Sequence, residues 1–253
     1  MGKRTESFRK RLRAAEPLVG TFIKTPSPIV AEVLSLSPLD VFCLDAEHAP
    51  FGRLEIDSCV GAFRSADTPS LVRVAADTAT EIRVALDAGA TGILVPHVTS
   101  AEQAERIVKS AHFGEGGRGF AGSPRAANYG TMGMDEHLRA SRDHTTIVVQ
   151  IEDLAALPNV TDIAKVDGID CLFIGRADLS VAMGKKISSP EIINAVAEVC
   201  AAARAAGTAV GMYTPNLSEI PGWRDAGASL FLLSSDQTFI LSGAHALAEA
   251  VKG

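Results

Sequence analysis

The chain has 253 residues, of which 47% are hydrophobic and 21% are charged, so it is long enough to form a large hydrophobic core. Its net charge of −6, with no stripe of Lys or Arg, argues against a nucleic-acid partner. No apolar run reaches the roughly 18 residues of a membrane span. The basic start, residues 1–14, lacks the apolar segment of a signal peptide and is expected to form a short capping helix. The four cysteines form no C-x-x-C pair, and Cys43 and Cys171 fall inside predicted strands. We therefore expect reduced thiols and a cytoplasmic protein.

Short apolar segments alternate with helical patterns along the chain. The predicted strands are residues 19–24, 40–44, 70–74, 91–95, 147–151, 171–174, 209–213 and 229–234. The predicted helices are residues 27–35, 54–65, 78–88, 100–111, 134–142, 154–166, 190–206, 217–226 and 239–251. The first of these helices has Ser27 in the N-cap position and Pro28 directly after it, as helix starts often do.

Eight successive strand–helix units predict a (β/α)8 barrel. The alternative is an open doubly wound sheet, which usually begins with a strand that leads straight into a glycine fingerprint, and this chain does not begin so. No break in composition suggests a linker, so residues 1–253 are interpreted as a single domain.

Residues 114–119 fit the pattern G-x-G-x-x-G, which in other proteins can mark a dinucleotide site. Here the motif neither follows a strand nor opens a helix, so we reject that interpretation. A loop whose glycines adopt positive φ explains the stretch better. Arg118 and Arg125 on this loop could meet an anionic substrate, or could simply be solvated.

In a barrel of this kind, active residues lie at the C-terminal ends of the strands. Acids, histidines, an amide, an arginine and hydroxyl side chains occur at those positions. They are Asp45, Glu47, His48, Arg73, His97, Gln150, Glu152, Asp178, Tyr213, Ser234, Ser235 and Asp236. Together they predict a ligand or metal site at this end of the barrel.

Each of these residues also has an ordinary structural interpretation. Glu152 and Asp178 could be helix N-caps, and Arg73 could be the structural partner of an acid such as Asp87. His97 could be a loop histidine with satisfied hydrogen bonds, and Asp45 and His48 could share an ordinary loop hydrogen bond. The remaining histidines are expected at the surface: His112, His137, His144 and His245.

The chain resembles the metal-dependent (class II) pyruvate aldolases of the 4-hydroxy-2-oxoheptane-dioate aldolase and citrate lyase-like family, in the phosphoenolpyruvate/pyruvate barrel superfamily. The matching segments run in order over nearly the whole chain. They are LDAEHAP (44–50), VRV (72–74), LDAGA (86–90), VP (95–96), GRG (117–119), QIE (150–152), GID (168–170), GRADLS (175–180) and MG (183–184).

The resemblance implies a role for each matching position. Glu152 and Asp178 would bind a divalent cation, Mg²⁺, Mn²⁺ or Co²⁺, that chelates a 2-oxo acid. Gln150 and backbone N–H groups around Ala177 would hold the substrate carboxylate. His48, oriented by Asp45, would act as base through a metal-bound water, and Arg73 would stabilise the enolate and alkoxide oxygens. Tyr213 and Arg118 are further expected substrate contacts.

The activity so implied is reversible cleavage of a 4-hydroxy-2-oxo acid to pyruvate, or hydroxypyruvate, and an aldehyde through a metal-bound enolate. The alternatives are an oxaloacetate decarboxylase, a citrate-lyase-like carbon–carbon lyase, and a non-catalytic protein that binds 2-oxo acids. Arg176 stands where the family commonly has proline, and Tyr213 stands where some relatives have smaller apolar residues. Relatives form hexamers, as trimers of dimers, with exchanged C-terminal helices, so the resemblance also implies a homo-oligomer.

Overall fold

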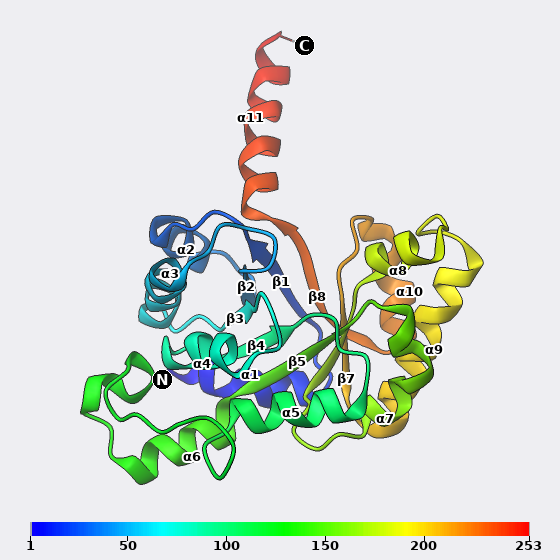
Figure 1. Ribbon diagram of the computed structural model, residues 1–253. Helices are drawn as coiled ribbons and strands as arrows, with labels where there is room; N and C mark the ends of the chain where they lie inside the picture. The colour runs from blue at the N-terminus through cyan, green and yellow to red at the C-terminus, as the bar shows by residue number, and fades with distance from the viewer. Residues whose placement is uncertain (1, 253) are drawn as a thin grey trace.

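The computed structural model describes residues 2–252, and its centre is a closed barrel of eight parallel strands in sequence order (Figure 1). The strands are β1 (Leu18–Ile23), β2 (Val41–Asp45), β3 (Ser70–Arg73), β4 (Gly92–Val95), β5 (Thr146–Ile151), β6 (Cys171–Ile174), β7 (Ala209–Met212) and β8 (Ala228–Ser235). Each predicted strand is present, with ends within one residue of the expected ones. The predicted barrel is therefore confirmed.

The helices are α1 (Lys3–Arg13), α2 (Pro28–Ser35), α3 (Arg53–Ser65), α4 (Ala79–Asp87), α5 (Ala101–Ala111), α6 (Met134–His144), α7 (Val160–Ala164), α8 (Arg176–Met183), α9 (Pro190–Ala206), α10 (Ile220–Asp225) and α11 (Asp236–Lys252). Most helices surround the barrel, while α1 lies under its lower end and α11 projects from it (Figure 1). Three 3₁₀ helices join them: η1 (Arg125–Gly130), η2 (Leu154–Asn159) and η3 (Leu217–Glu219). As predicted, Ser27 caps α2 by accepting a hydrogen bond from the Val30 N–H.

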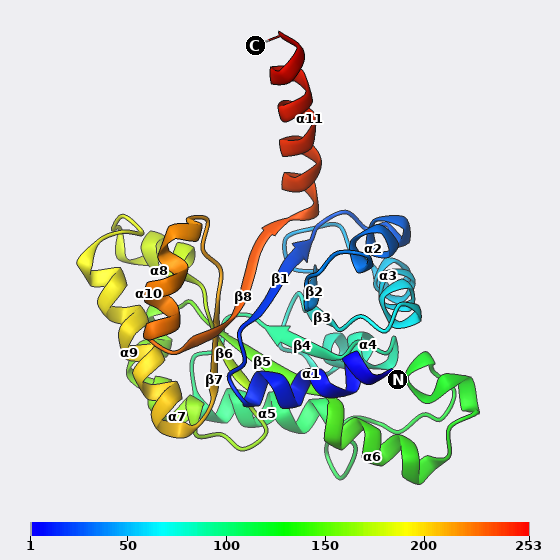
Figure 2. The same cartoon turned by 180° about the vertical axis from the view of Figure 1, so that it is seen from behind.

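The strands are buried on both faces, which explains why they read as continuous apolar runs. Outward-facing residues pack against the helices, and inward-facing residues fill the barrel in a second cluster. That second cluster includes Phe8 and Leu12 of α1, so the expected N-terminal helix closes the lower end of the barrel (Figure 2). The Arg9 side chain of α1 pairs with the buried carboxylate of Asp170, at 2.9 and 3.0 Å.

Three helices differ from the sequence-based prediction. The helix expected over residues 217–226 begins with a 3₁₀ turn, η3, before α10. The single helix expected over residues 154–166 is divided into η2 and α7, and Pro158, which has no N–H to donate, lies where the first turns would have continued. Helix α8 was not predicted, because only eight residues separate its start from its C-terminal Gly184 cap and its sequence shows weak amphipathic periodicity. It begins directly after β6 and so places Asp178 in its first turn.

Helix α11 leaves the barrel at the C-terminal end of β8 and stands away from the rest of the chain (Figure 1). Its apolar side chains are exposed: Phe239, Ile240, Leu241, Leu247 and Val251. Among the described residues, no helix combines the length and the apolar character needed to cross a membrane.

Candidate active site

The C-terminal ends of β2 and β3 hold a buried ion pair. Asp45 and Arg73 are register partners across these two strands. The Arg73 Nε donates a hydrogen bond to Asp45 Oδ1 at 2.9 Å, and a terminal nitrogen of the guanidinium forms an ion-pair contact with Oδ2 at 2.7 Å. Burial would raise the pKa of Asp45, but the hydrogen bonds and charge of Arg73 outweigh it and hold that pKa below its usual value. Asp45 is therefore a fixed negative charge. The alternative prediction, that Arg73 pairs with Asp87, is wrong, because Arg73 pairs with Asp45.

His48 follows this pair at the mouth of the barrel. Its backbone N–H donates to Asp45 Oδ1 at 3.1 Å, which fixes the turn after β2. The imidazole itself is exposed, and its Nε2 lies 3.7 Å from Glu47 Oε2. Asp45 thus positions His48 through the main chain, while Glu47 is the carboxylate nearest the ring. Glu47 stands at a strand end in the sequence, but no role was predicted for it.

The other acid of the site is Glu152, which follows β5 and is buried. Its Oε2 accepts a hydrogen bond from the Gln150 side-chain amide, and its Oε1 accepts one from the His97 backbone N–H at 3.0 Å. Burial raises the pKa of Glu152 to about 7; the His97 contacts work against that rise, and the negative charge of Asp178 adds to it. A buried carboxylate whose pKa is shifted in this way, beside a charged partner, is a candidate functional group.

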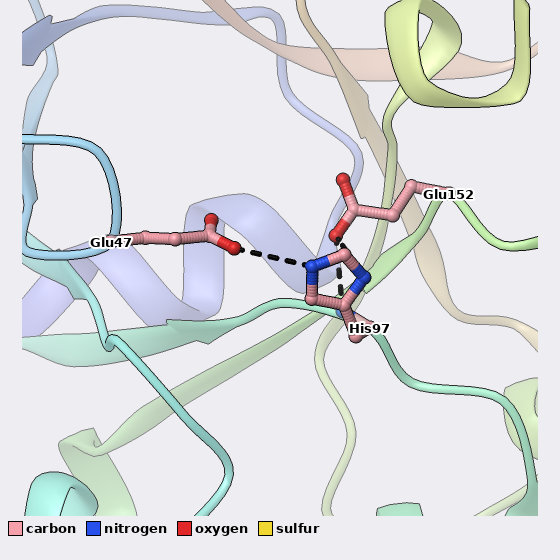
Figure 3. Close-up of side chains that lie close together, drawn as sticks. All are labelled: Glu47, His97 and Glu152. Atoms are coloured by element: carbon pink, nitrogen blue, oxygen red, sulfur yellow. Dashed lines mark hydrogen bonds and ion pairs between the residues drawn. The ribbon is translucent and has the colours of Figure 1, made fainter. Parts of the chain in front are cut away.

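His97 joins three acids across this edge. Its ring lies 3.3 Å from Glu47 Oε1 through Nε2, and its Nδ1 lies 3.4 Å from Glu152 Oε1 and 3.0 Å from Asp153 Oδ2. Figure 3 shows the ring standing between Glu47 and Glu152. The backbone of His97 has a φ of 56°, which is a strained conformation for a residue other than glycine. His97 is thus a loop histidine with partners, as one interpretation held, and those partners are site residues.

Glu47, His97 and Glu152 together offer three ligand atoms that lie within 4.8 Å of one another. The chain therefore has a possible metal site of two carboxylates and an imidazole. The sequence predicted a different pair, Glu152 and Asp178. Asp178 lies close enough for its charge to act on Glu152, and it faces the neighbouring cavity.

The two helix-cap interpretations are wrong. Asp153 occupies the N-cap of η2, and Gly175 occupies the N-cap of α8. Glu152 precedes its cap by one residue, and Asp178 lies inside its helix. Both acids are therefore left for another use.

A cavity of about 470 Å³ opens beside these acids, at the same end of the barrel. Several predicted site residues line it: Arg73, Gln150, Ala177, Asp178 and Tyr213. The remaining lining residues are Phe22, Lys24, Phe173, Gly175, Arg176, Ser234, Ser235, Gln237, Thr238 and Leu241. The cavity therefore has an acidic end at β5 and β6, an aromatic wall, and three cationic side chains, Lys24, Arg73 and Arg176, of which Arg176 is paired with Glu219.

Gly175 brings the acidic end of the cavity together. A Cβ at this position would lie 2.5 Å from the Glu152 Cβ and 2.7 Å from its Oε2. Only glycine therefore allows the start of α8 to pass so close to Glu152. The N–H groups of the first helical turn, around Ala177, then point toward the cavity end of α8, where an anion is favoured.

Arg176, the departure from the family pattern, does not leave its charge in this cavity. Its guanidinium lies 2.6 Å from Glu219 and 4.8 Å from the centre of the Trp223 ring. The same Glu219 oxygen accepts hydrogen bonds from Thr214 and Trp223. Arg176 therefore ties α8 to the segment after β7.

Arg118 is not brought to the site, and it is not solvated either. The glycine-rich loop folds back through a bridge between Phe113 and Arg118, with positive φ at Gly114 and Gly116 as expected for this loop. The guanidinium stacks 4.0 Å from the Phe113 ring centre and lies 4.0 Å from Asp87. Burial lowers its pKa to about 10.

His137 packs against the same loop. Its ring centre lies 5.1 Å from that of Phe113, and the side chain is 3% exposed. The surface position expected for His137 is therefore wrong. The reason is that the folded loop covers the inner face of α6.

Comparisons with known proteins identify relatives of this chain. The profile of the HpcH/HpaI aldolase/citrate lyase family matches residues 18–242. The chain is 32% identical to a hydroxypyruvate/pyruvate aldolase of Paraburkholderia phytofirmans, over 98% of both chains. It is also 32% identical to a 5-keto-4-deoxy-D-glucarate aldolase of Salmonella arizonae, over 97% of this chain and 96% of that protein.

A solved structure is similar over almost its whole length. It is a crystal structure of an HpcH/HpaI aldolase/citrate lyase family protein from Burkholderia cenocepacia, with a TM-score of 0.92 and 32% sequence identity. The match covers 98% of this chain and 100% of that one.

Proposed function

Because the chain belongs to the HpcH/HpaI aldolase/citrate lyase family, we propose that it cleaves a 4-hydroxy-2-oxo acid reversibly to pyruvate, or hydroxypyruvate, and an aldehyde. The relatives named above are aldolases that are about 32% identical over nearly the whole chain, so the chain is a carbon–carbon lyase rather than a simple binder of 2-oxo acids. The relatives above are named as aldolases, which favours aldol cleavage over citrate-lyase chemistry. The observation that carries the proposal is the buried Glu152 carboxylate beside a cavity that also presents Asp178, Gln150 and Arg73.

The acidic end of the cavity suits a divalent cation. Glu152 is buried with its pKa raised to about 7, and buried oxygens of Glu47 and Gln150 accept no hydrogen bond of good geometry from the described residues. Acceptor atoms gathered in this way are stabilised by a positive ion. We propose Glu152 and Asp178 as its ligands, with Mg²⁺, Mn²⁺ or Co²⁺ as the ion, since carboxylate oxygens suit these metals. Such a cation would polarise the 2-oxo group of the substrate and make the protons on carbon 3 more acidic.

The substrate carboxylate would lie against Gln150 and the start of α8. The first-turn N–H groups around Ala177 have no partner within the helix and favour an anion. Tyr213 and Phe22 would cover the carbon chain, because their rings form the adjacent wall, with centres 6.4 Å apart.

His48 would transfer the protons, and Arg73 would stabilise the negative charge that develops on the substrate oxygens. In cleavage, the His48 imidazole takes the proton of the 4-hydroxyl as the bond between carbons 3 and 4 breaks, and the aldehyde leaves. The same imidazole returns that proton to carbon 3 of the enolate, which gives the 2-oxo acid. The Arg73 guanidinium, held in place by Asp45, stabilises the negative charge on the oxygens during both steps.

The activity is tested with pyruvate or hydroxypyruvate plus a panel of aldehydes, with product formation followed by NMR in the presence of each metal. We expect a 4-hydroxy-2-oxo acid to form with the wild type, and Glu152→Gln to abolish its formation. Absence of product with every donor, aldehyde and metal, in folded protein that binds the metal, would refute the proposal.

The ligand set is tested by calorimetric titration of Mn²⁺. If Asp178 is a ligand, Asp178→Asn weakens Mn²⁺ binding by at least about tenfold. His97→Gln and Glu47→Gln should weaken it less. If instead His97→Gln abolishes binding and Asp178→Asn does not change it, the cluster of Glu47, His97 and Glu152 is the metal site.

We also propose that residues 1–253 act as a single domain within a homo-oligomer that exchanges α11 between copies. The support is the exposed apolar surface of α11, which its own barrel leaves uncovered (Figure 2). A hexamer built as a trimer of dimers is the specific form we propose. The four cysteines are buried free thiols, which agrees with the cytoplasmic location that we propose.

A further inference from the structure

Lys24 occupies a defined place on the wall of the cavity. It follows β1 directly and lines the same cavity as Arg73, Gln150 and Asp178. The buried carboxylate of Asp236 accepts hydrogen bonds from the Lys24 N–H at 2.7 Å and the Thr25 N–H at 3.0 Å. The main chain at Lys24 is therefore fixed to the start of α11, and the direction of the side chain into the cavity follows from that anchor.

The Lys24 ammonium has spare hydrogen-bonding capacity. Its Nζ lies 3.4 Å from Asp45 Oδ2, but the same oxygen already lies 2.7 Å from the Arg73 guanidinium. One carboxylate thus faces two cations, and Arg73 has the shorter contact. Within residues 2–252 the ammonium makes no hydrogen bond of good geometry, although it carries three N–H donors. A ligand in the cavity would therefore find these donors available.

The position of Lys24 in the barrel indicates which atom of a ligand it meets. Gln150 lies near the end of β5, and Glu152 and Asp178 come after β5 and β6, whereas β1 lies across the closed barrel from β5. A 2-oxo acid held at the acidic end would turn its carboxylate and its 2-oxo group toward β5 and β6. Carbon 3 would then point toward the wall formed by β1 and β8, where Lys24, Ser234 and Ser235 line the cavity.

We infer that Lys24 binds a hydroxyl group on carbon 3 of the donor, and so selects a 3-hydroxy-2-oxo acid over pyruvate. This inference rests on the proposed aldolase function. The ammonium donates to the hydroxyl oxygen. The buried Asp45 Oδ2, 3.4 Å from the ammonium, accepts no hydrogen bond of good geometry and can accept one from that hydroxyl group. A hydroxyl group matches such a donor–acceptor pair, whereas a second anion would face the Asp45 carboxylate.

The same contact discriminates against pyruvate. The methyl group of pyruvate, which is its carbon 3, displaces water from the Lys24 ammonium and offers no hydrogen bond in return. Sites that hydrogen-bond a substrate hydroxyl reject the analogue that lacks it, because the polar groups of the protein are left without partners. The aromatic wall of Phe22 and Phe173 makes no distinction between the two donors, so the selectivity depends on Lys24.

The test compares kcat/KM for hydroxypyruvate and pyruvate with one neutral acceptor, glycolaldehyde, and one metal. For Lys24→Met, a chain of similar length without charge, we expect the hydroxypyruvate-to-pyruvate ratio of kcat/KM to fall about 10- to 100-fold. Lys24→Arg should recover part of the ratio. Lys185→Met is the matched control. The Lys185 Nζ pairs with the Glu191 carboxylate at a distance of 2.8 Å, and this pair lies away from the site. This control should leave kcat/KM for both donors unchanged.

Two outcomes would overturn the role of Lys24. An equal loss with both donors would mean that Lys24 only supports the Asp45–Arg73 pair. If kcat/KM falls with glyoxylate as the acceptor but not with glycolaldehyde, Lys24 binds the acceptor aldehyde and not the donor. If the wild type uses neither donor, the proposed function fails instead. Thermal unfolding by circular dichroism checks that each variant is folded, and Lys24→Gln replaces Lys24→Met if the latter is not.

Discussion

At the scale of single residues, the site contains two buried acids that the surrounding structure treats in opposite ways. Burial acts to raise the pKa of both Asp45 and Glu152. Arg73 reverses this effect at Asp45, whereas Glu152 has only the His97 and Gln150 contacts and ends with a pKa of about 7. Asp45 is thus a permanent counterion for Arg73, and Glu152 is suited to bind a cation.

The raised pKa of Glu152 predicts how the stability of the metal-free protein changes with pH. The folded state holds a proton that the unfolded chain releases near pH 4.5, so stability falls as pH rises from about 4.5 to 7 and is then constant. Glu152→Gln removes this loss. The variant should exceed the wild type by up to about 3 kcal/mol at pH 8, and the excess should vanish near pH 4.5.

Urea unfolding of both proteins at several pH values, with and without Mn²⁺, measures this difference. Mn²⁺ should stabilise the wild type alone and so narrow the gap at pH 8. A wild type that gains stability relative to Glu152→Gln between pH 5 and 8, without metal, would contradict the account of Glu152.

The sequence predicted most of this site, because the C-terminal ends of parallel strands meet whatever the helices do. Asp45, Arg73, Gln150 and Asp178 were identified in this way. The links made by His97 could not be predicted, since they depend on a positive φ in a loop and on side chains that converge from β2, β4 and β5. The position of Arg118 was missed because a nonlocal contact, between the glycine-rich loop and α6, decides it.

At the scale of elements, the junction of β6 and α8 controls the geometry of the acidic end. Gly175→Ala would place a Cβ 2.5 Å from that of Glu152, so either the helix start or the carboxylate must move. A displacement of about 1 Å near reacting groups can lower the rate roughly 100-fold. We therefore expect Gly175→Ala to lose about that much kcat and to bind Mn²⁺ more weakly.

Gly133→Ala is the matched control for this prediction. Gly133 caps α6 with φ of −64°, and a Cβ there would meet nothing within 4 Å. The control should keep the wild-type kcat and Mn²⁺ affinity. If Gly175→Ala also behaves like the wild type, then the close approach of α8 to Glu152 does not position the carboxylate.

Helix α1 supports the barrel from its lower end, and its main polar anchor is the pair of Arg9 with Asp170. Asp170 is buried, and burial raises its pKa despite the charge of Arg9. Arg9→Met would leave that carboxylate without its nearest cation and should cost about 3–5 kcal/mol of unfolding free energy. Arg13→Met, which removes a more exposed partner at 3.6 Å, should cost less than about 1 kcal/mol.

Urea unfolding at pH 7 measures both values. Arg9→Met combined with Asp170→Asn should recover part of the lost stability, because no charge is then left buried. Equal effects of Arg9→Met and Arg13→Met would show that the anchor is not specific to Arg9.

The order of the elements could be predicted because strands buried on both faces give short apolar runs that helical periods separate. Helix α8 was missed since its eight residues follow β6 without a loop and carry little periodicity. The division of residues 154–166 was missed although Pro158 is visible in the sequence. In both places, local chemistry at the end of a strand overrides the periodic pattern.

At the scale of the whole molecule, α11 is the part of the structure that most needs a partner. If copies exchange this helix, a chain that ends at residue 238 loses the exposed apolar residues and should be monomeric. Light scattering after size-exclusion chromatography would show the change from the assembly of the full chain. Glu249→Ala, which removes no apolar surface from α11, is the control and should keep the wild-type mass. A truncated chain that keeps the mass of the full assembly would place the interface elsewhere.

The most direct test of the central claim is proton–deuterium exchange at carbon 3 of pyruvate and hydroxypyruvate in D₂O, followed by NMR with and without Mg²⁺ or Mn²⁺. It detects enolate formation without requiring the acceptor aldehyde. The account predicts exchange that requires the metal and that is lost in Glu152→Gln and His48→Ala. Exchange that persists in both variants, or its absence with both donors and both metals in folded, metal-loaded protein, would contradict the assignment of this cavity as an aldolase site.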